Sequence, residues 1–130
     1  MRLLLDTHTW LWQLLEPERL SRRASAALED SDSELHLSPL SVWEALLLAE
    51  KRRVTLEPDP VSWVREALRA SPVRSTELTP EVAIRSRQLE GFEVRDPVDR
   101  FLVATCIVGE MTLVTRDKRM RKYRKVRTLW

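Results

Sequence analysis

The chain has 130 residues, a formal net charge of +2, 43% hydrophobic residues and 32% charged residues. This length fits a single domain spanning residues 1–130, and this composition excludes a disordered or fibrous protein. No apolar run approaches the roughly 20 residues that a membrane-spanning helix needs, and the apolar start ends at Asp6, too early for a signal peptide. We therefore expect a cytoplasmic protein without a membrane segment.

The glycine and cysteine contents narrow the class further. The two glycines, Gly91 and Gly109, cannot form a glycine-rich phosphate loop, so enzymes that hold a nucleotide cofactor in such a loop are excluded. The single cysteine, Cys106, cannot form an intramolecular disulfide and lies within an apolar run. We expect it to pack in the core without a chemical role.

The first half of the chain alternates short apolar runs with segments of helical periodicity. In chain order it predicts a buried strand at 2–5, a helix through residues 10–15, a helix capped by Ser21, a strand at 35–38 and a helix ending near residue 53. Two starts are open for this last helix: Ser38 followed by Pro39, or Ser41.

The second half continues the alternation. Asp59 and Pro60 start a helix in which Val61, Val64 and Leu68 recur at helical spacing. The remaining elements predicted are a weak strand at 73–76, a helix from 80 to about 89, a buried helix at 98–108 begun by Asp96-Pro97 and stopped by Gly109, and strands at 111–115 and 126–129. This order is typical of an α/β domain with a parallel sheet, in which the carboxyl ends of the strands share one edge.

Four acidic residues are placed to meet at that edge. Asp6 ends the first strand, Asp117 follows the strand at 111–115, and Glu44 and Asp99 lie in the first turns of two helices. Clusters of oxygen ligands are what Mg²⁺ and Mn²⁺ require. Metal-assisted cleavage of a phosphodiester is therefore the leading hypothesis for the activity.

Helix capping explains each acid separately. Asp6, Asp96 and Asp117 are all suited to cap the helix that follows, and Ser41-x-x-Glu44 has the pattern of a capping box. The joint arrangement favours a metal site, because carboxylates that converge with no basic residue between them must raise a pKa or recruit a cation. His8 is open to two interpretations, a ligand or general base, or a packing residue.

A basic segment follows the last of these acids. Residues 116–127 hold eight Lys or Arg against the one acid Asp117, a local charge of +7. Such a strip suits the backbone of a nucleic acid, although a solvated charged tail is the plainer interpretation. Trp10 and Trp12 lie on different sides of their helix, so one of them is free to face a partner.

Four ordered motifs give the chain a resemblance to a known family. They are Leu3-Leu4-Leu5-Asp6-Thr7-His8, Leu37-Ser38-Pro39-Leu40-Ser41-Val42-Trp43-Glu44, Asp96-Pro97-Val98-Asp99-Arg100-Phe101-Leu102 and Leu113-Val114-Thr115-Arg116-Asp117. With Tyr123 and the terminal Trp130, they resemble a PIN-domain toxin of the VapC type from end to end. The resemblance implies a single three-layer α/β/α domain with a central parallel sheet of four or five strands.

The same resemblance implies an endoribonuclease that uses Mg²⁺ or Mn²⁺, forms a homodimer and is neutralised by a cognate antitoxin, as the toxin of a type II toxin–antitoxin system. The catalytic and metal-binding acids fall on Asp6, Glu44, Asp99 and Asp117, with Thr115 and Asp96 in support. We prefer Asp99 to Asp96 as the third acid, because Asp96 before Pro97 fits a helix cap. The residues expected to hold RNA are Arg116, Lys118, Arg119 and Arg121.

Other classes with acids on a parallel sheet fit less well. A phosphatase with an aspartate nucleophile needs a second Asp where His8 stands, and a phosphoacceptor receiver domain needs paired acids after the first strand. The alternative that stays open is an inactive PIN-like module that binds RNA or a protein without cutting.

Overall fold

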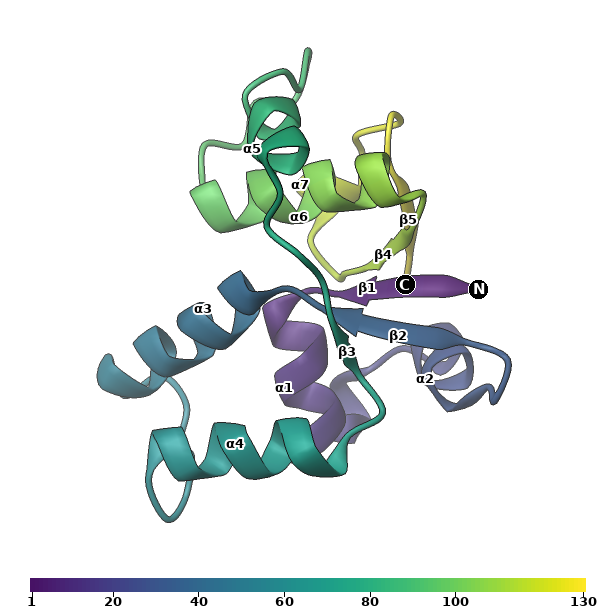
Figure 1. Ribbon diagram of the computed structural model, residues 1–130. Coiled ribbons are helices and arrows are strands. Elements are labelled where there is room, and N and C mark those ends of the chain that lie inside the picture. The colour runs from purple at the N-terminus through teal and green to yellow at the C-terminus, as the bar shows by residue number, and fades with distance from the viewer.

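The computed structural model describes residues 1–130 as five parallel strands in the order β3-β2-β1-β4-β5 (Figure 1). The strands are β1 (Arg2–Leu5), β2 (Glu34–Leu37), β3 (Arg74–Ser75), β4 (Thr112–Val114) and β5 (Arg127–Leu129). The predicted parallel sheet is therefore confirmed, each strand lying within about a residue or two of its expected range.

Helices cover both faces of this sheet (Figure 1). They are α1 (Thr7–Leu15), a short 3-10 helix (Pro17–Arg19), α2 (Arg22–Glu29), α3 (Pro39–Glu50), α4 (Pro60–Ala70), α5 (Pro80–Ser86), α6 (Pro97–Gly109) and α7 (Lys118–Arg121). The predicted three-layer α/β/α class is thus confirmed. None of the helices combines the length and the apolar character that a membrane crossing requires.

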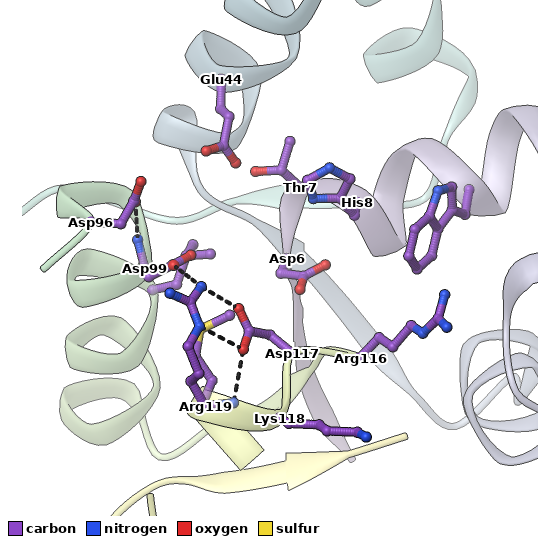
Figure 2. Close-up of a pocket in the computed structure, with 13 residues that line it drawn as sticks. Asp6, Thr7, His8, Glu44, Asp96, Asp99, Arg116, Asp117, Lys118 and Arg119 are labelled. Atoms are coloured by element: carbon purple, nitrogen blue, oxygen red, sulfur yellow. Dashed lines mark hydrogen bonds and ion pairs between the residues drawn. The ribbon is translucent and has the colours of Figure 1, made fainter. Parts of the chain in front are cut away.

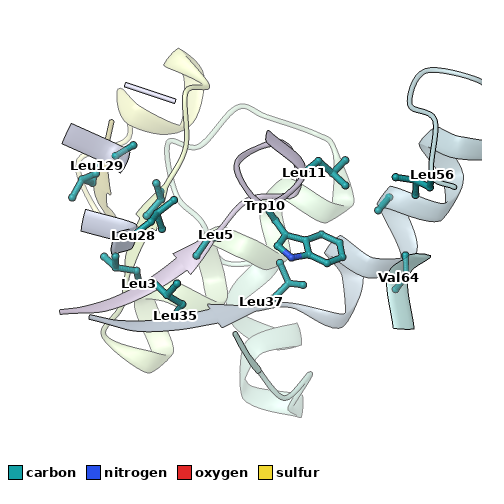
Figure 3. Close-up of a cluster of buried hydrophobic side chains, with 13 residues drawn as sticks. Leu3, Leu5, Trp10, Leu11, Leu28, Leu35, Leu37, Leu56, Val64 and Leu129 are labelled. Atoms are coloured by element: carbon teal, nitrogen blue, oxygen red, sulfur yellow. The ribbon is translucent and has the colours of Figure 1, made fainter. Parts of the chain in front are cut away.

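The side chains of β1 divide the core into two parts. Leu3 and Leu5 point to one face, where they pack with Trp10 of α1 and with apolar residues of α2, α3 and α4 (Figure 3). Leu4 points to the other face and packs against α6, where Cys106 is 1% exposed, as predicted. Because β1 is central and its three leucines are fully buried, it fixes the position of the residue that follows it, Asp6.

Of the two starts expected for α3, the structure has the one at Ser38 and Pro39. Ser38 caps α3, accepting a hydrogen bond from the N–H of Leu40 at 3.1 Å, and Pro39 takes the first helical position. Ser41 lies inside the helix and is fully buried, so the capping box expected of Ser41 and Glu44 does not form. Glu44 is thereby left for another role.

Three further expectations need correction. In α4 only Val64 is buried, while Val61 and Leu68 are 47% and 38% exposed, so helical spacing overstated the apolar face. The helix α5 ends at Ser86 and not near residue 89. Gly109 belongs to α6, and the left-handed conformation that ends this helix falls on Glu110, with φ of 52°.

Candidate functional site

A pocket of about 550 Å³ opens at the edge of the sheet where β1 and β4 end (Figure 2). Its lining includes five carboxylates, which are Asp6, Glu44, Asp96, Asp99 and Asp117. All four acids singled out from the sequence therefore surround one cavity, together with the alternative third acid. They come from β1, α3, α6 and the turn after β4, segments far apart along the chain.

Asp6 is the most buried of these acids, at 7% exposure. One carboxylate oxygen caps α1 by accepting a hydrogen bond from the N–H of Thr9 at 2.7 Å, and the other accepts one from the hydroxyl of Thr115. Burial raises the pKa of Asp6, and the hydrogen bonds from Thr115 and Thr9 oppose that rise. Asp6 thus caps α1 and lines the acidic pocket at the same time.

Thr115 connects two of the acids. Its hydroxyl donates to Asp6 and accepts a hydrogen bond from the N–H of Asp117 at 3.0 Å. Thr115 is completely buried at the end of β4, so the hydroxyl cannot turn to water. It therefore holds Asp6 and Asp117 in a fixed relation.

Asp99 has a raised pKa because of its position in the pocket. It lies in the first turn of α6, and its N–H donates to the carboxylate of Asp96 at 3.0 Å, so Asp96 caps this helix as expected. Burial, together with repulsion from Asp96, Glu44 and Asp117, raises the pKa of Asp99 to about 7. The carboxylates are therefore close enough to disfavour one another's charge.

A basic residue, Arg119, lies among the carboxylates. The metal-site hypothesis drawn from the sequence assumed that no basic residue stands between them. The guanidinium of Arg119 is 2.7 Å from one oxygen of Asp117 and donates to the other at 3.2 Å, and it lies 3.6 Å from Asp99 (Figure 2). These bonds lower the pKa of Asp117. Arg119, one of the residues expected to hold RNA, contacts these two acids in this structure.

Glu44 approaches the pocket from α3 and makes no hydrogen bond or ion pair, although it is only partly exposed. As the side chains stand, no group of three or more His, Cys, Asp or Glu is arranged to hold a metal ion. The chemistry of the donors nevertheless fits a hard cation, since every acidic ligand offered is a carboxylate oxygen. Arg119 is the counterion that these oxygens have in this structure.

Aromatic and basic side chains form the rim of the pocket. The ring of His8 lies 5.7 Å from the ring of Trp12, and the guanidinium of Arg116 lies 5.9 Å from the same ring. Trp10 is fully buried whereas Trp12 lines the pocket, so the expectation that they lie on different sides of α1 is confirmed. His8 makes no hydrogen bond to any acid, and both interpretations of it stay open.

The basic segment continues away from the acids. Lys118 also lines a neighbouring pocket of about 490 Å³, whose other charged members are Arg23, Arg121 and Lys122 and whose wall includes Trp130. Arg23 was not found from the sequence, because it lies nearly a hundred residues before α7 and only the fold brings it there. In Figure 2, Arg116 and Lys118 point away from the carboxylates, unlike Arg119.

Comparisons with known proteins agree with this fold. Residues 3–126 match the PIN-domain family. Ribonuclease VapC22 of Mycobacterium tuberculosis is 40% identical over 129 residues, which cover 98% of this chain and 97% of that protein. The chain therefore belongs to the PIN-domain family and, within it, to the VapC-type toxins, as the sequence motifs had suggested.

Solved structures extend the likeness of the fold. VapBC2 from Rickettsia felis, bound to a DNA fragment from its promoter, has a TM-score of 0.74 at 12% identity and covers 98% of this chain and 97% of its own. A toxin–antitoxin complex from Klebsiella pneumoniae has a TM-score of 0.65 at 22% identity, with 95% and 93% covered. At these identities the likeness concerns the fold alone.

Proposed function

We propose that this protein is an endoribonuclease toxin that hydrolyses RNA phosphodiester bonds at the acidic pocket with a bound Mg²⁺ or Mn²⁺. The observation that carries the proposal is the gathering of five carboxylates in one pocket, where burial and repulsion from Asp96, Glu44 and Asp117 raise the pKa of Asp99 to about 7. The relative named as a ribonuclease at 40% identity supports the choice of RNA.

Each acid has a distinct place in this proposal. Asp6 and Asp99 would hold the cation, Asp117 would join them with its oxygens released by Arg119, and Glu44 would act through water. A bound cation would lower the pKa of a water molecule and neutralise the phosphate that it attacks. Thr115 keeps Asp6 and Asp117 aligned for this ligand set.

The basic rim supplies the affinity for RNA. We propose that Arg116, Lys118 and Arg121 contact phosphates, because cations on one rim of a cleft hold a polyanion along its backbone. Trp12, at the mouth of the acidic pocket, and Trp130, in the neighbouring basic pocket, offer aromatic faces for stacking with unpaired bases. Single-stranded segments are thus the substrates favoured.

A second groove fits a protein partner. It has a volume of about 930 Å³ between α1 and α3, and its wall includes Leu15 and Trp43, which are 41% and 55% exposed. The groove and the acidic pocket share His8, Trp12, Glu44 and Asp96. We propose that the cognate antitoxin occupies this groove, because a chain lying there reaches the carboxylates directly.

We further propose that the protein forms the homodimer that its family implies, which light scattering of the purified chain tests.

Cleavage of RNA tests the activity. Purified protein is incubated with single-stranded and structured RNAs and Mn²⁺, with EDTA and the Asp6→Asn variant as controls. The matched variant Asp32→Asn changes an exposed Asp before β2, at the opposite edge of the sheet. We expect cleavage by the wild type and by Asp32→Asn, and none with EDTA or with Asp6→Asn. Cleavage that persists both with EDTA and in the Asp6→Asn variant contradicts the mechanism.

The contact of Arg119 with Asp117 and Asp99 favours one alternative, an inactive PIN module that binds RNA or a protein. In that case Arg119 is a permanent counterion of the acids, and the protein binds no Mn²⁺. Wild-type protein that neither cuts RNA nor binds Mn²⁺, yet still retains RNA on its basic rim, establishes this alternative.

A further inference from the structure

We propose that Arg119 competes with the divalent cation for the carboxylates and so sets the affinity of the site for metal. This inference rests on the proposed function, because it concerns the same acidic pocket. It means that Arg119, a residue of the toxin itself, controls how readily the site binds a divalent cation.

The contacts of Arg119 are those of a bound cation. Its guanidinium holds both oxygens of Asp117, at 2.7 and 3.2 Å, and lies 3.6 Å from an oxygen of Asp99. Both acids belong to the proposed ligand set, and Arg119 brings the one guanidinium that contacts them. A metal ion that takes these oxygens must therefore replace the guanidinium.

The side chain of Arg119 is free to leave without disturbing the fold. The backbone N–H of Arg119 donates to the carboxylate of Asp117 at 2.8 Å, and through this bond Asp117 caps α7 independently of the Arg119 side chain. The side chain itself is 63% exposed. It also lines a second pocket of about 420 Å³, shared with Arg95, Lys122 and Arg124, so there is space beside the acidic pocket for it to move into.

Release of Arg119 changes the charge of the pocket as well as its space. With the guanidinium among the acids, part of their negative charge is already neutralised, and a divalent ion gains less from binding. Without it, Asp117 and Asp99 have no guanidinium beside them, and a divalent ion among the five carboxylates gains more from binding. Both effects make the metal bind more tightly when Arg119 is removed.

The test measures Mn²⁺ binding by the electron paramagnetic resonance signal of the free ion, with no RNA present. The proteins compared are the wild type, Arg119→Gln, Arg119→Lys and the control Arg121→Gln, which removes the same charge from α7 at a residue that does not line the acidic pocket. Thermal unfolding of each variant verifies that it is folded.

We expect Arg119→Gln to bind Mn²⁺ roughly three- to tenfold more tightly than the wild type, and Arg121→Gln to change the affinity less than about twofold. Arg119→Lys should fall between them, because a lysine keeps the charge and loses the two-point contact. Equal affinities for Arg119→Gln and the wild type overturn this inference and leave the proposed function standing. Absence of Mn²⁺ binding in both proteins overturns the proposed function and the inference with it.

Discussion

The hydroxyl of Thr115 donates a hydrogen bond to the carboxylate of Asp6, joining the ends of two neighbouring strands across 109 positions of sequence. The same hydroxyl accepts from the N–H of Asp117, so one buried side chain orients two acids of the pocket. In the chain, Asp6 and Asp117 have no local connection. Their alignment depends on this hydrogen bond and on the register that pairs Leu5 with Val114.

Replacing Thr115 therefore tests how the acids are held. Thr115→Val keeps the shape and removes the hydroxyl, leaving a buried carboxylate oxygen and a backbone N–H without their partner. We expect the free energy of unfolding to fall by about 1–3 kcal/mol, measured by urea denaturation, and RNA cleavage to fall with it.

The control is Thr115→Ser, which keeps the hydroxyl and loses only a methyl group. We expect it to retain most of the stability and most of the activity. If valine and serine behave alike in both measurements, the hydroxyl does not organise the site, and the effect of the substitutions is one of packing alone.

The raised pKa of Asp99 predicts a dependence of stability on pH. Its pKa is about 7 in the folded protein against an ordinary value of 3.8, so between these values the folded state keeps a proton that the unfolded chain releases. The stabilisation from the protonated form is complete below pH 3.8 and is lost as the pH rises through 7. Asp117 acts in the opposite direction, because Arg119 lowers its pKa.

Asp99→Asn isolates this effect. Without divalent cations, we expect the variant to be more stable than the wild type at about pH 8, by about 1–3 kcal/mol, and to differ much less at about pH 5. Thermal unfolding across this range is the measurement. A difference that does not change with pH shows that burial and the neighbouring carboxylates do not raise the pKa of Asp99.

Arg100, next to the proposed ligand Asp99, has a separate structural role. Its guanidinium donates to the carbonyls of Ser86, Phe92 and Val94 at 2.9, 3.1 and 2.9 Å, tying the loop before α6 to that helix. We expect Arg100→Met to lower the free energy of unfolding by about 1–3 kcal/mol, because three partly buried carbonyls lose their donor.

The control for Arg100 is Arg95→Met, which changes an exposed arginine of the same loop that makes no hydrogen bond. Its effect on urea denaturation should stay within about 0.5 kcal/mol. Equal losses for the two variants mean that the three carbonyl contacts do not stabilise the loop.

The groove between α1 and α3 predicts the effect of Trp43, whose side chain is 55% exposed. We expect Trp43→Asp to leave thermal stability nearly unchanged and to weaken binding of the cognate antitoxin on the order of tenfold or more, measured by calorimetry. The matched variant Leu78→Asp changes an apolar residue that is 44% exposed and outside the groove. Equal affinities for both variants place the antitoxin elsewhere.

The features of this structure that depend on local sequence pattern could be predicted from the sequence. Apolar runs located four of the strands, the weak strand expected at 73–76 contains β3, and the acids after β1 and β4 were found because parallel strands end at one edge. Asp59 and Asp96 were correctly read as helix caps, since each stands before a proline at the first helical position. These signals lie within a few residues of the feature that they specify.

The parts that failed depend on contacts between distant segments. Helical spacing could not reveal that Val61 and Leu68 face solvent, because this depends on which neighbour covers α4. Arg119 belongs to a run of basic residues, and nothing in that run separates it from Lys118 or Arg121. Only the fold brings α7 beside the first turn of α6 and places one arginine between two acids.

The central claim is that Asp6, Asp99 and Asp117 share a divalent cation. The most direct measurement is a crystal structure of the protein soaked in Mn²⁺, with the ion located by its anomalous scattering. The account predicts a peak within about 2.0–2.5 Å of oxygens from at least Asp6 and Asp99, with Arg119 moved away from Asp117. No peak in the pocket, with Arg119 still bonded to Asp117 at saturating Mn²⁺, would contradict it.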